Sequence, residues 1–179
     1  MQAFTLVIFG ATGNLVRCKL MPSLFQLEEA GRLPEKMGIV AFARRPWDGA
    51  RWLQEVEGML REKYGENLNL QVFERFKARH HYLQGDLHDT DSVERLKNTL
   101  TEDARFAANT IFYMAIRPSD FGEAIDRLGH AGLLGEQSSW RRVVLEKPFG
   151  YDLLSAQALQ QGLHRYLRES QIYRIDHYL

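Results

Sequence analysis

The chain has 179 residues, enough for one domain with a real core, and its 45% hydrophobic and 26% charged residues are ordinary for a folded soluble protein. Its 23 basic and 23 acidic residues balance, so no global field attracts nucleic acid or an anionic membrane, and any phosphate recognition must be local. The single Cys18 excludes an internal disulfide, no segment resembles a signal peptide and no apolar run is bilayer-sized, so a cytoplasmic enzyme or binding domain is the default expectation.

Short apolar runs alternate with longer amphipathic ones along the chain, which predicts strands separated by helices. Pro22 is expected to kink or divide the first helix. Helices between strands imply right-handed crossovers, so the predicted fold is α/β: a doubly wound parallel sheet, Rossmann-like, with helices on both faces and one domain over residues 1–179. In chain order the predicted elements are a strand at 4–9, a helix at 14–30, a strand at 38–43, helices at 47–64 and 70–76, a strand at 81–83, a helix at 92–101, a strand at 110–115, a helix at 121–129, a strand at 143–145 and a helix at 153–167.

The loop after the first predicted strand carries the strongest local chemistry. It reads Gly10-Ala11-Thr12-Gly13-Asn14-Leu15 and opens a helix. Gly10 permits a sharp turn, and Gly13 lets a pyrophosphate approach backbone N–H groups at a helix N-terminus. The GxxGxL pattern departs from the common GxGxxG, and the alternative is a strand-to-helix turn whose glycines serve geometry only.

The end of the second predicted strand indicates which coenzyme would bind. NAD-binding folds commonly carry an acidic residue there for the ribose 2′-hydroxyl, whereas this strand ends at Ala43-Arg44-Arg45. A guanidinium suits a 2′-phosphate and offers no acceptor to a free hydroxyl, so Arg44 favours NADP over NAD. The alternative is two solvated arginines beside Pro46.

Polar residues follow the other predicted strands. Asp86 and Leu87 end the third strand and would border the adenine, although a turn residue and a core leucine explain them equally well. Lys19 precedes Pro22 in the first helix and could face the crevice, or be an ordinary surface lysine. Lys147-Pro148 follows the fifth strand, at the sheet edge where doubly wound folds bind ligands, and a cis bond there would shape a nicotinamide pocket.

The last residues place a carboxylate, an imidazole and a phenol together, in Asp176, His177 and Tyr178. No polar tail or helix stop signal follows them. This cluster is interpreted as half of a site, completed by groups from chain that is not present.

Five motifs together resemble one family, in their order and approximate spacing. They are GATGNLVRCKLMPSLFQLEEAGRL, AFARR, FYMAIRPSDFG, LEKPFG and RIDHYL. The chain resembles the N-terminal coenzyme domain of glucose-6-phosphate dehydrogenase, whose full chains are more than twice as long. The resemblance implies NADP-dependent oxidation of glucose 6-phosphate to the 6-phospholactone, the first step of the oxidative pentose phosphate pathway. It also implies homo-oligomers formed through a C-terminal α+β domain that is absent here.

The resemblance implies a role for each matching position. Lys147 would contact both the nicotinamide end and the sugar, Lys19 would lie near the reacting hydroxyl, and Asp176 would orient a protonated imidazole at the catalytic centre. The general-base histidine would lie downstream, so the isolated chain is expected to bind NADP without turnover. The remaining implied contacts are Gly10, Ala11, Thr12, Gly13, Asn14, Leu15, Val16 and Arg17 with the pyrophosphate, Arg44 with the 2′-phosphate, Asp86 and Leu87 with the adenosine, and His177 and Tyr178 with the sugar phosphate.

The chain departs from the family pattern at a few positions, and other functions are compatible with parts of the sequence. Asn14 and Val16 replace the usual Asp and Ala, Cys18 replaces a basic residue, and Arg117 replaces a proline. A stand-alone NADP(H)-binding sensor or regulatory module is one alternative, and a complete short-chain reductase is another, but no Tyr-x-x-x-Lys pair supports the latter. The three histidines His80, His81 and His88 lack a second ligand cluster, so no metal is predicted. An exposed apolar face is expected where the absent domain would pack.

Overall fold

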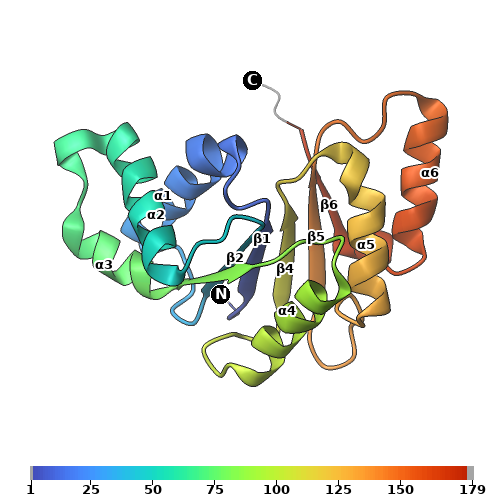
Figure 1. The fold of residues 1–179 in the computed structure, drawn as a ribbon, viewed down its shortest axis with the longest axis horizontal. Coiled ribbons are helices and arrows are strands. Elements are labelled where there is room, and N and C mark those ends of the chain that lie inside the picture. Colours follow the sequence, from blue (N-terminus) through green and yellow to red (C-terminus); the bar gives the residue numbers. More distant parts are fainter. Residues whose placement is uncertain (1, 177–179) are drawn as a thin grey trace.

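The computed structural model describes residues 2–176 and contains a six-stranded sheet between helices (Figure 1). Every neighbouring pair of strands is parallel. The strand order is β3-β2-β1-β4-β5-β6, so the doubly wound parallel sheet predicted from the sequence is confirmed. The strands are β1 (Thr5–Phe9), β2 (Gly38–Ala43), β3 (His80–Gln84), β4 (Thr110–Met114), β5 (Arg141–Glu146) and β6 (Ile172–Ile175).

Helices cover both faces of the sheet. One group packs on the face that includes Ile8 and Ile39, and the other packs on the face that includes Val7 and Phe9. All residues of β1 are buried, as expected for a central strand with helices on both sides. Within residues 2–176, no helix is long and apolar enough to cross a lipid bilayer. The first group is α1 (Met21–Glu29), α2 (Gly49–Tyr64) and α3 (Leu70–Ala78), and the second is α4 (Thr90–Glu102), α5 (Phe121–His130) and α6 (Leu153–His164).

Side-chain caps fix where four helices begin. Asp48, Asn69, Asp89 and Asp152 precede α2, α3, α4 and α6, and each accepts a hydrogen bond from a backbone N–H in the first turn of its helix. Such caps satisfy N–H groups that the helix itself leaves unpaired. The helix predicted from residue 47 therefore begins at Gly49, directly after its cap.

The first helix contains a π-helical turn, η1 (Val16–Leu20), immediately before α1. The N–H of Met21 donates to the carbonyl of Val16, five residues back. The next residue, Pro22, has no N–H, so the α-helical hydrogen bond to Cys18 cannot form. The division of this helix expected at Pro22 is therefore present, and its form is a one-residue widening rather than a break.

The sheet has one strand more than the five predicted. Residues 172–175 pair in parallel with β5 and form the edge strand β6, with Glu146 opposite Ile175. The sequence Ile-Tyr-Arg-Ile does not predict this strand, because half of it lacks the apolar character of a buried strand. As an edge strand it needs burial on one side only.

One face of the strands β4, β5 and β6 is not covered by any helix among the described residues. All three helices near β4, β5 and β6 pack on the face of Phe112, Val143 and Ile172. On the opposite face, a mainly apolar hollow of about 490 Å³ lies over these strands, and the Tyr173 side chain is 53% exposed. This matches the exposed apolar face expected from the sequence. The hollow is lined by Ile111, Trp140, Arg142, Val144, Tyr173, Arg174 and Ile175.

Candidate functional site

A cavity of about 860 Å³ opens at the carboxyl ends of β1, β2, β3 and β4. This is the edge where the strand order reverses, and doubly wound folds bind ligands there. Six residues predicted from the sequence line it together, although they lie far apart in the chain. They are Gly10, Thr12, Gly13, Arg44, Asp86 and Leu87.

The glycine turn is shaped by close contact with the loop after β4. Gly10 has a φ of 73°, and a Cβ added there would lie 2.2 Å from the carbonyl oxygen of Ala115. The N–H of Gly10 donates to the carbonyl of Phe42 at 3.1 Å, and the N–H of Gly13 donates back to Gly10 at 2.9 Å. The turn therefore brings the backbone to the cavity floor just before the first helix, where an anion is favoured.

The loop after β2 presents the two arginines differently. The Tyr82 hydroxyl donates to the carbonyl of Arg45 at 2.7 Å and fixes the loop backbone. The Arg45 guanidinium lies over the Trp47 ring, 5.0 Å from its centroid. Arg44 is exposed on the cavity wall, and within residues 2–176 it forms no ion pair. Its guanidinium is thus available for an anionic ligand.

The loop after β3, next to the arginine loop in the sheet order, also lines the cavity. Asp86 turns its carboxylate onto its own loop, where Oδ1 accepts a hydrogen bond from the N–H of His88 at 3.0 Å. The His88 Nδ1 lies 2.9 Å from Oε2 of Glu123 on α5. The hydrogen bond with Glu123 raises the pKa of His88 above its ordinary value, and it lowers the pKa of Glu123.

A second polar cluster lies past β5 and β6. Lys147 Nζ is 2.8 Å from Asp176 Oδ2, so the structure brings together two residues that the sequence singled out. The Lys147–Pro148 bond is cis. Beside them the Tyr113 hydroxyl donates to the Glu146 carboxylate, and burial raises the pKa of Tyr113 well above its ordinary value. Because β5 and β6 run parallel, their carboxyl ends place these groups at one sheet edge.

Several predicted residues do not line the first cavity. Ala11 and Val16 are buried in the core. The Arg17 guanidinium pairs with Glu62 on α2, and Lys19 is exposed on the π-helical turn. The remaining two, Asn14 and Leu15, begin the helix. His177 and Tyr178 lie outside the described residues.

Other residues line the cavity that sequence reasoning missed. The segment 115–117 follows β4 and lines the cavity, and Asp120 follows it on a 3-10 turn, η3 (Pro118–Asp120). The position of segment 115–117 directly after a parallel strand could have identified it from the sequence, because the segments after all parallel strands lie at the same edge of the sheet. The sequence suggests a surface role for His88, and only the contact with α5 distinguishes it.

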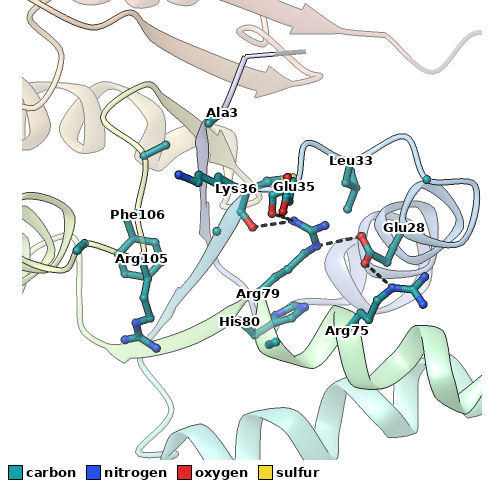
Figure 2. Close-up of a pocket in the computed structure, with 16 residues that line it drawn as sticks. Ala3, Glu28, Leu33, Glu35, Lys36, Arg75, Arg79, His80, Arg105 and Phe106 are labelled. Carbon is teal, nitrogen blue, oxygen red and sulfur yellow. Dashed lines mark hydrogen bonds and ion pairs between the residues drawn. The ribbon is translucent and has the colours of Figure 1, made fainter.

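A second cavity, of about 780 Å³, lies at the opposite, amino-terminal edge of the sheet (Figure 2). Arg79 crosses it: its Nε is 2.9 Å from Oε2 of the buried Glu28, and its Nη1 donates to the carbonyls of Pro34, Glu35 and Met37. These bonds hold the segment between α1 and β2 in place. Arg79 therefore has a structural role in this cavity, which lies away from the edge of the sheet where doubly wound folds bind ligands.

The strand order, the glycine turn and the cavity at the switch point define a Rossmann-type dinucleotide-binding domain. The family described as "Glucose-6-phosphate dehydrogenase, NAD binding domain" matches residues 7–179. The chain therefore belongs to the glucose-6-phosphate dehydrogenase family.

Individual relatives agree with this assignment. Glucose-6-phosphate 1-dehydrogenase of Dickeya dadantii is 39% identical over 178 residues, which cover 99% of this chain and 35% of the relative. Glucose-6-phosphate 1-dehydrogenase 2 of Mycobacterium tuberculosis is 37% identical, over 97% of this chain and 35% of the relative. The chain thus spans about a third of the length of these relatives.

Solved structures show the same fold. Glucose-6-phosphate 1-dehydrogenase from Mycobacterium avium superimposes with a TM-score of 0.86 at 33% identity, over 99% of this chain and 36% of that one. A glucose-6-phosphate dehydrogenase in complex with its substrate glucose 6-phosphate gives a TM-score of 0.82 at 29% identity, over 98% of this chain and 36% of that one.

Proposed function

We propose that this chain is the coenzyme-binding part of an enzyme that oxidises D-glucose 6-phosphate to 6-phospho-glucono-1,5-lactone with NADP as hydride acceptor. The observation that carries the choice of coenzyme is Arg44 on the cavity wall at the end of β2, without an ion-pair partner in residues 2–176. The names of the relatives, and the complex of one solved relative with glucose 6-phosphate, support the choice of reaction.

The cavity suits a dinucleotide in its donor set and its size. The glycine turn would hold the pyrophosphate through backbone N–H groups, Arg44 would bind the 2′-phosphate, and Asp86 and Leu87 would border the adenosine. A volume of about 860 Å³ falls within the range of small-molecule sites. Bound NADP supplies the nicotinamide C4 that accepts a hydride from C1 of the sugar.

The residues past β5 and β6 would serve the reacting end. Lys147 carries a cation that would bind the sugar and the nicotinamide side, and its pairing with Asp176 at 2.8 Å would keep that cation oriented. Asp176 would in turn stabilise the imidazolium formed when a histidine takes the proton of the C1 hydroxyl. Lys19 would assist near that hydroxyl, and His177 and Tyr178 would bind the sugar phosphate. The proposed oligomerisation would involve the part of the protein that the relatives have beyond this third.

Replacement of Arg44 tests the coenzyme assignment. Arg44→Ala should weaken NADP binding about 10- to 100-fold, because it removes a charge-assisted contact with the 2′-phosphate. NAD binding should change by less than about threefold, since NAD has no such phosphate. Both affinities can be measured by intrinsic tryptophan fluorescence, since Trp47 lies beside the loop.

Arg61→Ala is the matched control for this experiment. Arg61 is an exposed arginine of α2 that pairs with Glu57, four residues before it, and it lies outside the cavity. Its removal should leave both affinities unchanged. Equal affinity of the parent chain for NADP and NAD, unaltered by Arg44→Ala, would refute the proposed 2′-phosphate site.

A further inference from the structure

His88 occupies a wall position in the cavity that the family motifs do not account for. It lies on the loop between β3 and α4, its side chain is 45% exposed, and it lines the same cavity as Arg44. Two bonds fix its backbone: its N–H donates to Asp86 Oδ1, and the next N–H, of Asp89, donates to the carbonyl of Asp86 at 3.0 Å. The imidazole therefore has a defined place beside the adenosine side of the site.

Glu123 holds the imidazole from the other side. It lies on the first turn of α5, and its Oε2 is 2.9 Å from Nδ1 of His88. With Nδ1 engaged, the ring presents Nε2 as its remaining polar atom. Arg127 supports the arrangement from the next turn of α5, 3.5 Å from Glu123 Oε1, while its Nη1 donates to Thr90 at the start of α4. The His88–Glu123 pair thus joins the loop after β3 to α5.

The charges around His88 are mostly acidic. Its carboxylate neighbours raise its pKa above the ordinary 6.5, with the Glu123 hydrogen bond as the largest cause and partial burial opposing it. Arg117 pairs with Asp120 at 3.2 Å, which offsets one of these carboxylates. The charged groups that face His88 or the cavity beside it are Glu123 and Arg127 from α5, Asp120 and Arg117 from η3 and the residue before it, Asp86 from the same loop, and Arg44 and Arg45 from the end of β2.

From this arrangement we infer that His88 belongs to the coenzyme site, where its protonated imidazole, held by Glu123, acts together with Arg44 on the adenosine 2′-phosphate. The inference rests on the proposed NADP binding and adds a regulation to it. An imidazolium attracts the phosphate and a neutral imidazole does not. NADP therefore binds more tightly when His88 is charged, and its affinity falls as the pH rises through the pKa of His88.

The experiment measures NADP affinity by tryptophan fluorescence between about pH 6 and pH 9, the range around an ordinary histidine pKa. From the acid to the alkaline end, the parent chain should lose about threefold to tenfold more affinity than His88→Gln. Comparison at each pH cancels the titration of the ligand's own phosphate, which occurs near pH 6. NAD serves as the second ligand and should show no difference of this kind between the two proteins.

Glu123→Gln supplies an independent readout. Without the carboxylate partner, the midpoint of the affinity change should move to lower pH, because the imidazole loses the contact that favours its charged form. His164→Gln is the matched control, because His164 is paired with Glu169 at 3.3 Å in the same way but lies outside the cavity. It should keep the pH profile of the parent chain.

Each result decides between separate conclusions. A profile unchanged by both His88→Gln and Glu123→Gln, in a chain that binds NADP, overturns the role of His88 and leaves the proposed function standing. A loss of affinity in His88→Gln that is equal at every pH and for both coenzymes also overturns it, since it indicates contact with the base. Failure of the parent chain to bind either coenzyme refutes the proposed function and the inference together.

Discussion

The environment of His80 differs from that of the other strand-end histidine beside it. Its Nδ1 accepts a hydrogen bond from the indole N–H of Trp52 at 3.2 Å, so in the neutral ring Nε2 carries the hydrogen. Nε2 is buried, and no hydrogen-bond partner reaches it within residues 2–176. Burial lowers the pKa of His80 to about 3, with the adjacent charge of Arg79 as a second cause. The folded protein therefore holds this imidazole neutral.

This burial predicts a loss of stability in acid. The pKa in the folded state lies below the ordinary 6.5 of the unfolded chain, so the unfolded chain binds the proton more readily between these values. The contribution of neutral His80 is present above about pH 6.5 and is lost as the pH falls, by at most about 1.4 kcal/mol per pH unit. Urea unfolding of the parent chain and of His80→Gln at a series of pH values measures it.

The comparison with His80→Gln separates this effect from the titration of carboxylates, which both proteins share. The stability of the parent chain relative to the variant should decrease steadily below about pH 6.5. His81 has a lowered pKa for the same reason, partial burial, but it is present in both proteins. A constant difference down to about pH 4 would contradict the neutral, buried imidazole.

Single residues also show where sequence reasoning reached its limit. Arg44 lies at the cavity because its position at the end of a strand determines the edge it reaches, and its contact with a 2′-phosphate stays a prediction. The sequence does not distinguish His80, His81 and His88, which all read as surface or strand-end residues. Their different environments depend on Trp52, Arg105 and Glu123, which come from other elements and are not fixed by local sequence.

At the scale of elements, Arg79 ties three parts of the molecule together. It ends α3 and pairs with the buried Glu28 of α1 (Figure 2). It also donates to three carbonyls of the segment 34–37 that leads into β2. The Arg79 side chain is 13% exposed and that of Glu28 is 5% exposed. Water therefore cannot replace these contacts fully.

Removal of Arg79 should accordingly be costly. Arg79→Met is expected to lower the free energy of unfolding by about 3–5 kcal/mol, because it removes the shorter of the two ion pairs of a buried carboxylate and the donor to three backbone carbonyls. Arg75→Met is the matched control: Arg75 lies 3.6 Å from the same Glu28 but is 55% exposed, so its loss should cost less than about 1 kcal/mol. Equal losses in the two variants, measured by urea unfolding, would show that Arg79 is not a structural tie.

The elements themselves were largely predictable. The first two strands were the clearest, because a strand buried on both faces has a continuous apolar run, whereas β3 is a partly exposed edge strand that begins with two histidines. Caps such as Asp48 moved helix starts by one or two residues only. The sixth strand was missed because Tyr173 and Arg174 leave one side of an edge strand polar or exposed. Pro22 indicated the division of the first helix, but its π-helical form depends on a hydrogen bond that no local pattern specifies.

At the scale of the whole molecule, two sites lie along one sheet edge. The dinucleotide cavity occupies the ends of β1 to β4, and the Lys147–Asp176 pair occupies the ends of β5 and β6. Within residues 2–176, the half of the sheet face that no helix covers lies on β4, β5 and β6, the strands next to the Lys147–Asp176 pair. The matched relatives are about three times as long, so under the proposed function this chain would supply one side of a substrate pocket, next to the uncovered sheet face.

This arrangement predicts binding without turnover. The purified chain should bind NADP but form no NADPH when glucose 6-phosphate is added, as followed by absorbance of the reduced nicotinamide. If the general-base histidine belongs to the two thirds of the relatives that this chain does not match, its absence alone should reduce the rate about 10²- to 10⁴-fold. The loss of substrate positioning by the same part should cost up to about 7–11 kcal/mol more. The relevant control is a longer relative assayed under the same conditions. A rate for this chain near about 10 s⁻¹, an ordinary value for enzymes, would contradict the prediction.

The π-helical turn at Val16–Leu20 has a consequence for how this loop tolerates insertion and deletion. A π turn holds one residue more than the α-helical turn it replaces, and each residue rotates a helix by about 100°. Deletion of one residue here would therefore leave an ordinary α-helical turn of about the same total rotation, and the glycine turn would keep its direction relative to the buried face of α1. In the regular turns of α1 the same deletion would instead rotate everything before it by about 100°. The π turn thus marks the place in this helix where the loss of a single residue would disturb the packing least.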